Sequence, residues 1–316
     1  MFPRFSESQA VRKGAPMSRA TAGDRLAVGL MLALLMLGSR ARVFAANSMG
    51  TAQELDAEYV YVGGASTHGA GLNIGSIDEN SADIKYVISP QITKDLLLRF
   101  GVEWQAFFFG VPVHAPVPDR LEQVSAVLGM DYQFADQWLM RAEVQPGIYS
   151  DFTDVKWDDV DAPLVLGAVY LADEDLQWFF GLRADFRSQY PVLPAAGLRW
   201  KFADEWVLNF VLPNPRLEFD ANERLQLYIG AGLDAGTFRV GENFGTDHGL
   251  PKLDNEVVDY FEIRLGAGCS WKLAPYVTVD AGAGYMPYRS WDFFDPNIVF
   301  RSHNAPYGQV ACHARF

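Results

Sequence analysis

Residues 96–108 read LLLRFGVEWQAFF, a stretch in which apolar side chains recur at every second position. Successive side chains of a β-strand point to opposite faces of a sheet. The stretch therefore predicts a strand with two different faces. One face carries Leu96, Leu98, Phe100, Val102, Trp104, Ala106 and Phe108, and the other carries Leu97, Arg99, Glu103 and Gln105.

The same period of two recurs along the chain. Further stretches that show it are residues 124–134, 138–145, 177–186, 225–233, 261–269 and 277–285. Repeated segments of about ten residues with alternating hydropathy are typical of transmembrane β-barrels, whose apolar face points to lipid and whose polar face points inward. A soluble β-sandwich also alternates, so this pattern alone leaves a second fold class open.

Short turns with a shared pattern favour the barrel. FADQW at residues 134–138, LADEDLQW at 171–178 and FADEW at 202–206 place aromatic or apolar side chains on both sides of a tight turn, and FDANE at 219–223 is a looser copy. Aromatic rings of membrane barrels gather where strand ends meet the lipid headgroups. Aromatic residues also flank hairpin turns of soluble proteins as cross-strand pairs.

Two kinds of connection alternate along the chain. Short turns are expected near residues 89–95, 135–137, 172–175, 203–205, 220–223 and 272–275, and longer loops near 66–80, 109–120, 147–162, 187–192, 240–256 and 287–305. Outer-membrane barrels have short periplasmic turns and long external loops. We expect an all-β fold, a single antiparallel transmembrane β-barrel of about 14 strands, an even number as such barrels need. If Pro213 and Pro215 only bend one strand, the alternative is about 12.

The composition excludes several other classes of protein. An apolar fraction of 49% argues against disorder, and 2 Cys are too few for a disulfide scaffold. A net charge of -13 argues against a nucleic-acid partner. Cys269 and Cys312 are expected on the lipid-facing sides of two strands separated by a third, which is too far apart for a disulfide. No cofactor is expected.

Residues 1–45 are predicted to be a secretory signal peptide, which leaves residues 46–316 as the barrel domain. The apolar run LAVGLMLALLML at residues 26–37 follows Arg19 and Arg25, and Ala45 provides a cleavage site. The run is shorter than the roughly 20 residues that a membrane-spanning helix needs, although a retained anchor is the alternative. A start at Met17 would give the leader a more usual length.

The last strand resembles the final strand of Gram-negative outer-membrane barrels. It covers residues 307–316 and ends in Phe316, the residue type that commonly ends such strands and is read by the barrel assembly machinery. Ala314 departs from the pattern, because a larger apolar residue is usual there. PGIYSDF at 146–152, VLPAAGLRW at 192–200 and LPNPR at 212–216 also resemble one uncharacterised barrel family, known only as a domain of unknown function.

The resemblance implies a location and partners. It implies export through the periplasm to the cell outer membrane, where lipid and lipopolysaccharide surround the barrel. It gives no substrate and no catalytic residue.

Charged residues on the predicted inner faces are the candidate site. They are Arg99, Glu103, Arg141, Glu143, Arg183, Asp185, Arg199, Arg216, Glu218, Glu262, Arg264 and Asp280. Opposite charges two or four residues apart share one face of a strand and can pair along or across strands. Such pairs either fill and rigidify the lumen or line an aqueous channel, where a transverse field selects small solutes.

An acidic loop is a weaker candidate for a metal site. Its carboxylates are Asp151, Asp154, Asp158, Asp159 and Asp161. They could hold Ca²⁺ or bridge through it to lipopolysaccharide. The residue order of an EF-hand is missing, so a solvated acidic loop is the simpler interpretation.

Three functional hypotheses follow. The first is a channel for passive diffusion of small hydrophilic solutes, and the second is a closed structural or adhesive barrel that acts through its external loops. The third is a lipid-modifying enzyme, for which Ser66 near His68 is the one lead. Because neither an H-E-x-x-H nor a G-x-S-x-G pattern is present, we expect no enzyme.

Overall fold

The structure is a computed structural model that describes residues 50–316, so the predicted signal peptide lies outside the described residues. No helix in this range is long and apolar enough to cross a membrane. The strands are β1 (Thr51–Gly69), β2 (Leu72–Thr93), β3 (Leu96–Gly110), β4 (Arg120–Ala135), β5 (Trp138–Val144), β6 (Gly147–Ser150), β7 (Val160–Asp161), β8 (Leu164–Leu171), β9 (Leu176–Ala184), β10 (Val192–Ala203), β11 (Trp206–Phe210), β12 (Arg216–Asp220), β13 (Leu225–Arg239), β14 (Val257–Ala274), β15 (Val277–Phe293), β16 (Ile298–His303) and β17 (Ala305–Arg315). The short helices η2 (Trp157–Asp159), α2 (Phe244–Asp247) and η3 (Pro251–Leu253) lie in connections.

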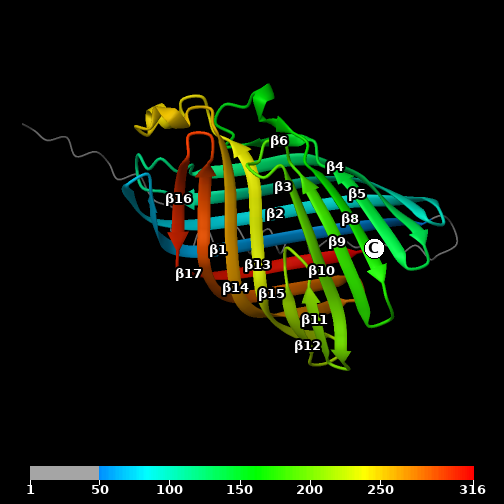
Figure 1. The fold of residues 1–316 in the computed structure, drawn as a ribbon. Coiled ribbons are helices and arrows are strands. Elements are labelled where there is room, and N and C mark those ends of the chain that lie inside the picture. The colour runs from blue at the N-terminus through cyan, green and yellow to red at the C-terminus, as the bar shows by residue number, and fades with distance from the viewer. Residues whose placement is uncertain (1–49) are drawn as a thin grey trace, which may run out of the picture. The chain divides into compact units, whose positions relative to one another are not determined.

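The strands form one closed antiparallel barrel (Figure 1). β6, β7 and β16 are short and continue the lines of β5, β8 and β17, so the 17 strands make a wall of fourteen. The last strand closes the wall, because β17 pairs with β1 from Arg315 opposite Glu54 to Tyr307 opposite Val62. The prediction of a single antiparallel barrel of 14 strands is confirmed, and the β-sandwich alternative is wrong.

The alternative of twelve strands is also wrong. β11 ends at Phe210 and β12 begins at Arg216, so residues 211–215 connect two strands. Proline has no backbone N–H to donate to a neighbouring strand, which suits Pro213 and Pro215 to a connection.

The barrel has two different ends, which we call the turn end and the loop end. Connections at the turn end are residues 94–95, 136–137, 172–175, 204–205, 221–224 and 275–276. Connections at the loop end are residues 70–71, 111–119, 185–191, 211–215, 240–256 and 294–297, together with the stretch 145–163 that contains β6, η2 and β7. The start of β1, at Thr51, and the last residue, Phe316, both lie at the turn end.

Two of the predicted loops are largely strand. Residues 66–80 belong to β1 and β2 except for a tight turn at Ala70 and Gly71, where φ is 51° and 75°. Positive φ at both central residues is what a type I′ hairpin turn requires. Residues 287–305 contain the end of β15, all of β16 and the start of β17. In both places the strands continue past the part of the wall whose outer face is apolar.

Aromatic side chains surround the turn end on the outer face. The ring centroids of Trp138 and Tyr170 lie 4.9 Å apart, and those of Trp206 and Phe219 also lie 4.9 Å apart. These rings stand beside the short turns that the sequence pattern singled out. This is the level at which amphipathic rings of a membrane barrel meet the headgroups.

Both cysteines are free. Cys269 of β14 pairs with Ala281 of β15, and Cys312 of β17 pairs with Val279 of β15. One strand therefore separates the two cysteines, as expected.

Candidate functional site

The inner face of β1–β5 carries charged side chains that are buried and paired. Arg99 of β3 donates from Nη2 to Glu54 Oε2 at 3.1 Å, from Nη1 to Asp131 Oδ2 at 3.4 Å and from Nε to Glu143 Oε2 at 3.3 Å. Lys85 of β2 donates to Glu143 Oε1 at 2.7 Å. These groups come from five neighbouring strands and meet inside the barrel. These hydrogen bonds and ion pairs stabilise the arrangement of the five strands from inside the barrel.

A second buried network lies nearer the loop end. Arg289 of β15 donates from Nη1 to Glu79 Oε2 at 2.6 Å, and the Tyr260 hydroxyl donates to the same oxygen at 2.8 Å. Arg264 donates from Nη2 to Asp234 Oδ2 at 2.5 Å. The side chains of Arg289 and Glu79 are almost completely inaccessible to solvent. Burial of this kind is tolerated only because each charge has a partner.

The inner face of β5–β12 carries three solvent-exposed arginines, although Glu143 and Glu218 on the same face are buried. The side chains of Arg141, Arg183 and Arg199 are 45%, 37% and 42% exposed. Those of Arg99 and Arg264 are 2% and 4% exposed. All five side chains point inward, so one side of the lumen is filled by protein and the other side is accessible to solvent.

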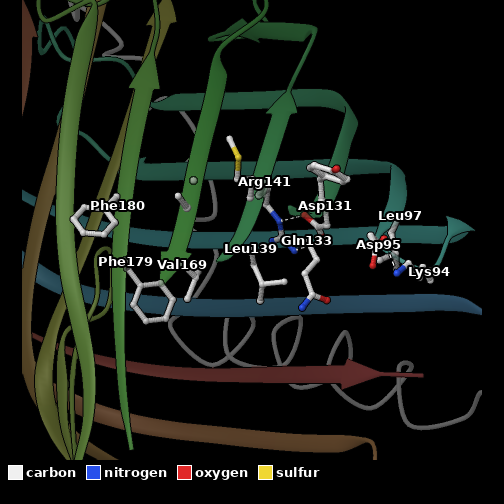
Figure 2. Close-up of a pocket in the computed structure, with 14 residues that line it drawn as sticks. Lys94, Asp95, Leu97, Asp131, Gln133, Leu139, Arg141, Val169, Phe179 and Phe180 are labelled. Atoms are coloured by element: carbon white, nitrogen blue, oxygen red, sulfur yellow. Dashed lines mark hydrogen bonds and ion pairs between the residues drawn. The ribbon is translucent and has the colours of Figure 1, made fainter. Parts of the chain in front are cut away.

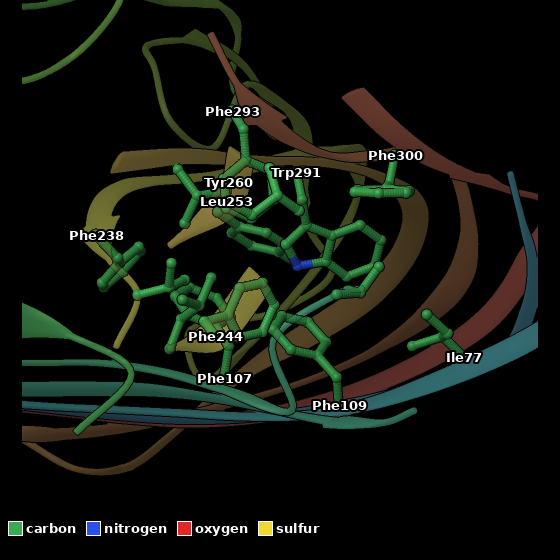
Figure 3. Packing of buried hydrophobic residues seen from close by; sticks show 14 of the residues in the cluster. Ile77, Phe107, Phe109, Phe238, Phe244, Leu253, Tyr260, Trp291, Phe293 and Phe300 are labelled. Carbon is green, nitrogen blue, oxygen red and sulfur yellow. The ribbon is translucent and has the colours of Figure 1, made fainter. Parts of the chain in front are cut away.

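An apolar core closes the loop end on the filled side (Figure 3). Its largest fully buried members are Trp291, Tyr260, Phe107, Phe238, Phe293 and Phe300. The ring of Trp291 meets Phe109 edge-on at 5.0 Å between centroids, and Phe107 lies 4.6 Å from Tyr260. These rings come from the inner faces of β3 and β13–β16, so the lumen is occupied there by side chains.

Residues 147–161, which we call the latch segment, cross the lumen at the loop end. Ser150 of β6 lies opposite Arg239 of β13 in parallel register, although these strands are far apart around the wall. The Asp151 N–H donates to the Arg239 carbonyl at 3.0 Å, and Asp151 Oδ2 accepts from the Gly241 N–H at 2.8 Å. Arg239 Nε donates to the Asp158 carbonyl at 3.1 Å. The latch segment thus divides the loop end into a filled part and a part bounded by β7–β12.

Charges at the edge of the latch segment add to this contact. Lys156 forms ion pairs with Asp154 at 2.8 Å and with Glu242, which follows β13. Hydrogen bonding to Asp154 and Glu242 raises the pKa of the Lys156 ammonium group above its ordinary value. The cation therefore stays charged at neutral pH.

The structure places nearly all of the sequence-predicted charges on inner faces of strands. These are Arg99 and Glu103 on β3, Arg141 and Glu143 on β5, Arg183 on β9, Arg199 on β10, Arg216 and Glu218 on β12, Glu262 and Arg264 on β14, and Asp280 on β15. Asp185 follows the end of β9 and is buried beside Arg183, at 3.2 Å.

Most of these charges pair with residues of other strands. Arg216 donates to Asp280 at 3.0 Å, and Glu218 lies 3.9 Å from Arg199. Of the expected pairs within one stretch, Arg183 with Asp185 and Glu262 with Arg264 are formed, the second at 3.5 Å. Side chains opposite each other on adjacent strands are about 5 Å apart at Cβ, whereas residues i and i+2 of one strand are separated by about 6.6 Å. Cross-strand partners are therefore favoured.

Sequence reasoning missed the acidic inner face of β1 and the arginine at the centre of the second network. Glu54, Asp56 and Glu58 recur at a period of two and could have been read from the sequence. Arg289 could not, because its neighbourhood was assigned to a loop. Its partner Glu79 also lies in a stretch that was predicted to be a loop.

The carboxylates of the acidic loop do not gather at one point in the structure. Among residues 50–316, no group of three or more His, Cys, Asp or Glu side chains is placed to hold a metal ion. Two of the carboxylates accept hydrogen bonds from the backbone. Asp159 Oδ2 accepts from the Lys156 N–H at 2.7 Å, and Asp161 Oδ1 accepts from the Ala162 N–H at 2.7 Å.

Ser66 and His68 lie on β1, on its exposed face, and pair across to β16 opposite His303 and Arg301. Phe316 exchanges backbone hydrogen bonds of 2.9 Å with Gln53 at the closure between the first and last strands.

One protein family matches the sequence. Its description is "Domain of unknown function (DUF6268)", and its model matches residues 114–312, more than half of the chain. The chain belongs to this family. The predicted resemblance to an uncharacterised family of outer-membrane barrels is confirmed. No curated protein sequence matches the chain.

Several solved barrels are similar in fold. An outer membrane channel from Pseudomonas putida F1 is 8% identical, with 87% of this chain and 100% of that chain covered and a TM-score of 0.47. A FadL homologue of Pseudomonas aeruginosa is 10% identical, with 84% and 90% covered and a TM-score of 0.41. The KdgM porin in complex with disordered oligogalacturonate is 8% identical, with 83% and 99% covered and a TM-score of 0.34.

Proposed function

We propose that the protein is an outer-membrane channel for passive diffusion of small hydrophilic solutes. The observation that carries the proposal is the solvent exposure of Arg141, Arg183 and Arg199 on the inside of the wall. Where protein fills a lumen, the inward charges are buried, as they are here around Arg99 and Arg289. Charges that water can reach from within the lumen support an aqueous path along β5–β12.

The distribution of charge across the lumen supports selection of polar solutes. Arg199 lies on β10, the eighth strand of the wall of fourteen, and is therefore opposite β1. The inner face of β1 carries Glu54, Asp56 and Glu58. Basic and acidic groups on opposite sides set up a transverse field, which orients polar solutes and slows apolar ones.

The proposal places the turn end in the periplasm and the loop end outside the cell. Short turns at one end and longer connections at the other are the arrangement of outer-membrane barrels. In this orientation the assembly machinery reads Phe316 at the periplasmic end, and the carboxylates of the loop end face lipopolysaccharide. The proposal includes no catalytic step, and Ser66 and His68 have no role in it.

A closed barrel that acts through its loops is the second candidate function. The apolar core around Trp291 and the latch segment favour it, because both obstruct the lumen at the loop end. Under this function the exposed arginines would line a cavity open only at the turn end.

Conductance in planar lipid bilayers distinguishes the two functions. We expect the purified barrel to give discrete current steps in KCl, and liposomes that contain it to swell in small sugars and amino acids. Liposomes prepared with the heat-denatured protein are the control. An absence of steps over a wide range of salt concentrations, with no solute entry, would reject the channel and leave the closed barrel.

A further inference from the structure

The lumen contains a hollow near the turn end, beside β3, β4, β5, β8 and β9. Its volume is about 560 Å³, within the range of small-molecule sites. Half of the lining residues have side chains that face inward, and they are Leu97, Asp131, Gln133, Leu139, Arg141, Val169 and Phe179. These side chains place the hollow on the inside of the wall.

One boundary of the hollow is an apolar shelf. Leu139, Val169 and Phe179 lie opposite one another on β5, β8 and β9 in continuous register. Figure 2 shows the three side chains in a row. Leu139 is 39% exposed although it faces the lumen. Apolar surface that faces water costs free energy, which a ligand with an apolar body would recover on binding.

Gly167, which lines the hollow, provides space above the shelf. Gly167 of β8 and Gly181 of β9 lie opposite each other, and Gly167 lies opposite Arg141. A Cβ added at Gly167 would meet no atom closer than 3.9 Å, and one added at Gly181 none closer than 3.8 Å. Neither glycine has a positive φ. A larger residue would therefore fit at Gly167 without strain, and its side chain would fill part of the hollow.

The polar edge of the hollow carries Arg141 and Lys94 together with the acceptors of Asp131, Asp95 and Gln133. Arg141 donates from Nε and Nη2 to the two oxygens of Asp131, at 2.7 and 2.8 Å (Figure 2). Asp131 Oδ2 also accepts from Arg99 at 3.4 Å, so both of its oxygens are occupied. Arg141 Nη1 has no partner among residues 50–316, and Lys94 reaches only Asp95, at 3.7 Å. The free N–H groups of the Arg141 guanidinium can donate to an anion.

We propose that this hollow binds a small amphiphilic monocarboxylate. Its aliphatic or aromatic body lies on Leu139, Val169 and Phe179, and its carboxylate accepts from Arg141 Nη1. This assignment rests on the proposed function and adds to it the class of solute that binds near the turn end. The charged head keeps such a solute in the aqueous path, while the shelf holds its apolar part.

Octanoate is the probe for this site. The experiment is calorimetric titration of the full barrel in lipid nanodiscs, with empty nanodiscs subtracted and with acetate and octan-1-ol as matched ligands. We expect octanoate to bind at least about tenfold more tightly than either, since each ligand lacks one of the two interactions. Equal affinities for octanoate and octan-1-ol would overturn the assignment of Arg141.

A pair of neighbouring substitutions tests the hollow. Gly167→Leu points into the lumen and Ala168→Leu points to lipid. We expect Gly167→Leu to abolish octanoate binding, Ala168→Leu to preserve it, and Arg141→Gln to weaken it about tenfold. Circular dichroism reports whether each variant is folded. Undiminished binding by folded Gly167→Leu would contradict the proposal.

Failure of this inference is distinguishable from failure of the channel. Current steps without octanoate binding would reject the site and leave the channel. Octanoate binding that depends on Gly167 and Arg141, without current steps, would reject the channel and leave a binding barrel.

Discussion

Replacement of Arg289 by alanine is expected to lower the free energy of unfolding by about 3–5 kcal/mol, the usual cost of removing one partner from a buried ion pair. Glu79 would then be a buried carboxylate that keeps only the Tyr260 hydroxyl, at 2.8 Å. The guanidinium also lies 5.0 Å from the centroid of the Trp291 ring, so the apolar core loses a contact too. Urea unfolding of the barrel in lipid vesicles, followed by tryptophan fluorescence, measures the change.

Two variants make this prediction specific. Arg301→Ala removes an exposed arginine of β16 at the same end and should change the free energy of unfolding by less than about 0.5 kcal/mol. The double substitution Glu79→Gln and Arg289→Met removes both charges and should recover most of the loss, because no uncompensated charge remains. A double variant as unstable as Arg289→Ala would show that packing, rather than charge pairing, sets the cost.

Release of the latch segment is expected to increase the open probability of the channel by about tenfold, which corresponds to about 1.4 kcal/mol. The variant is Asp151→Ala combined with Arg239→Ala. It removes the acceptor of the Gly241 N–H and the donor to the Asp158 carbonyl, and each such hydrogen bond contributes about 0.5–3 kcal/mol. The backbone pairing of Ser150 with Arg239 then keeps only the Lys156–Glu242 ion pair as side-chain support.

Single-channel recording measures this effect. Asp154→Ala is the matched control, since it removes a carboxylate from the same segment that binds only the exposed Lys156. We expect its open probability to equal that of the unmodified protein. If the double variant and the control behave alike, the latch segment does not restrict the path.

The sequence was sufficient for the barrel because its lipid-facing residues are consistently apolar. Leu98, Phe100 and Val102 on one face and Arg99 and Glu103 on the other leave a single consistent interpretation of β3. The number of strands depended on Pro213 and Pro215, whose missing N–H groups end two strands.

The strands at the loop end could not be predicted, because their inner face is apolar and their outer face is polar. Trp291 and Phe293 point inward and are buried, while Asp292 between them points outward. Phe300 is likewise buried inside, next to the exposed Arg301. Above the lipid, a barrel buries apolar residues within and shows polar ones to water, as a soluble protein does. The outer faces of these strands are polar. The sequence pattern of a lipid-facing strand is therefore missing there, and loops are predicted instead.

The ion-pair partners of residues in the lumen could not be predicted from the sequence either. Arg99 meets Glu54, Asp131 and Glu143 from three other strands, and their meeting depends on register and on closure of the wall. Alternation identifies the inward face of each strand but not which strands lie opposite each other across the lumen.

Thiol modification of conductance tests the aqueous path along β5–β12 most directly. The variants are Arg199→Cys, whose side chain points into the lumen, and Leu198→Cys, whose side chain points to lipid, both with Cys269 and Cys312 replaced by alanine. A charged, water-soluble thiol reagent is predicted to reduce the current steps of the Arg199→Cys channel by about half or more and to leave those of Leu198→Cys unchanged. Absence of current steps, or equal responses of the two variants, would contradict a water-filled path beside β10.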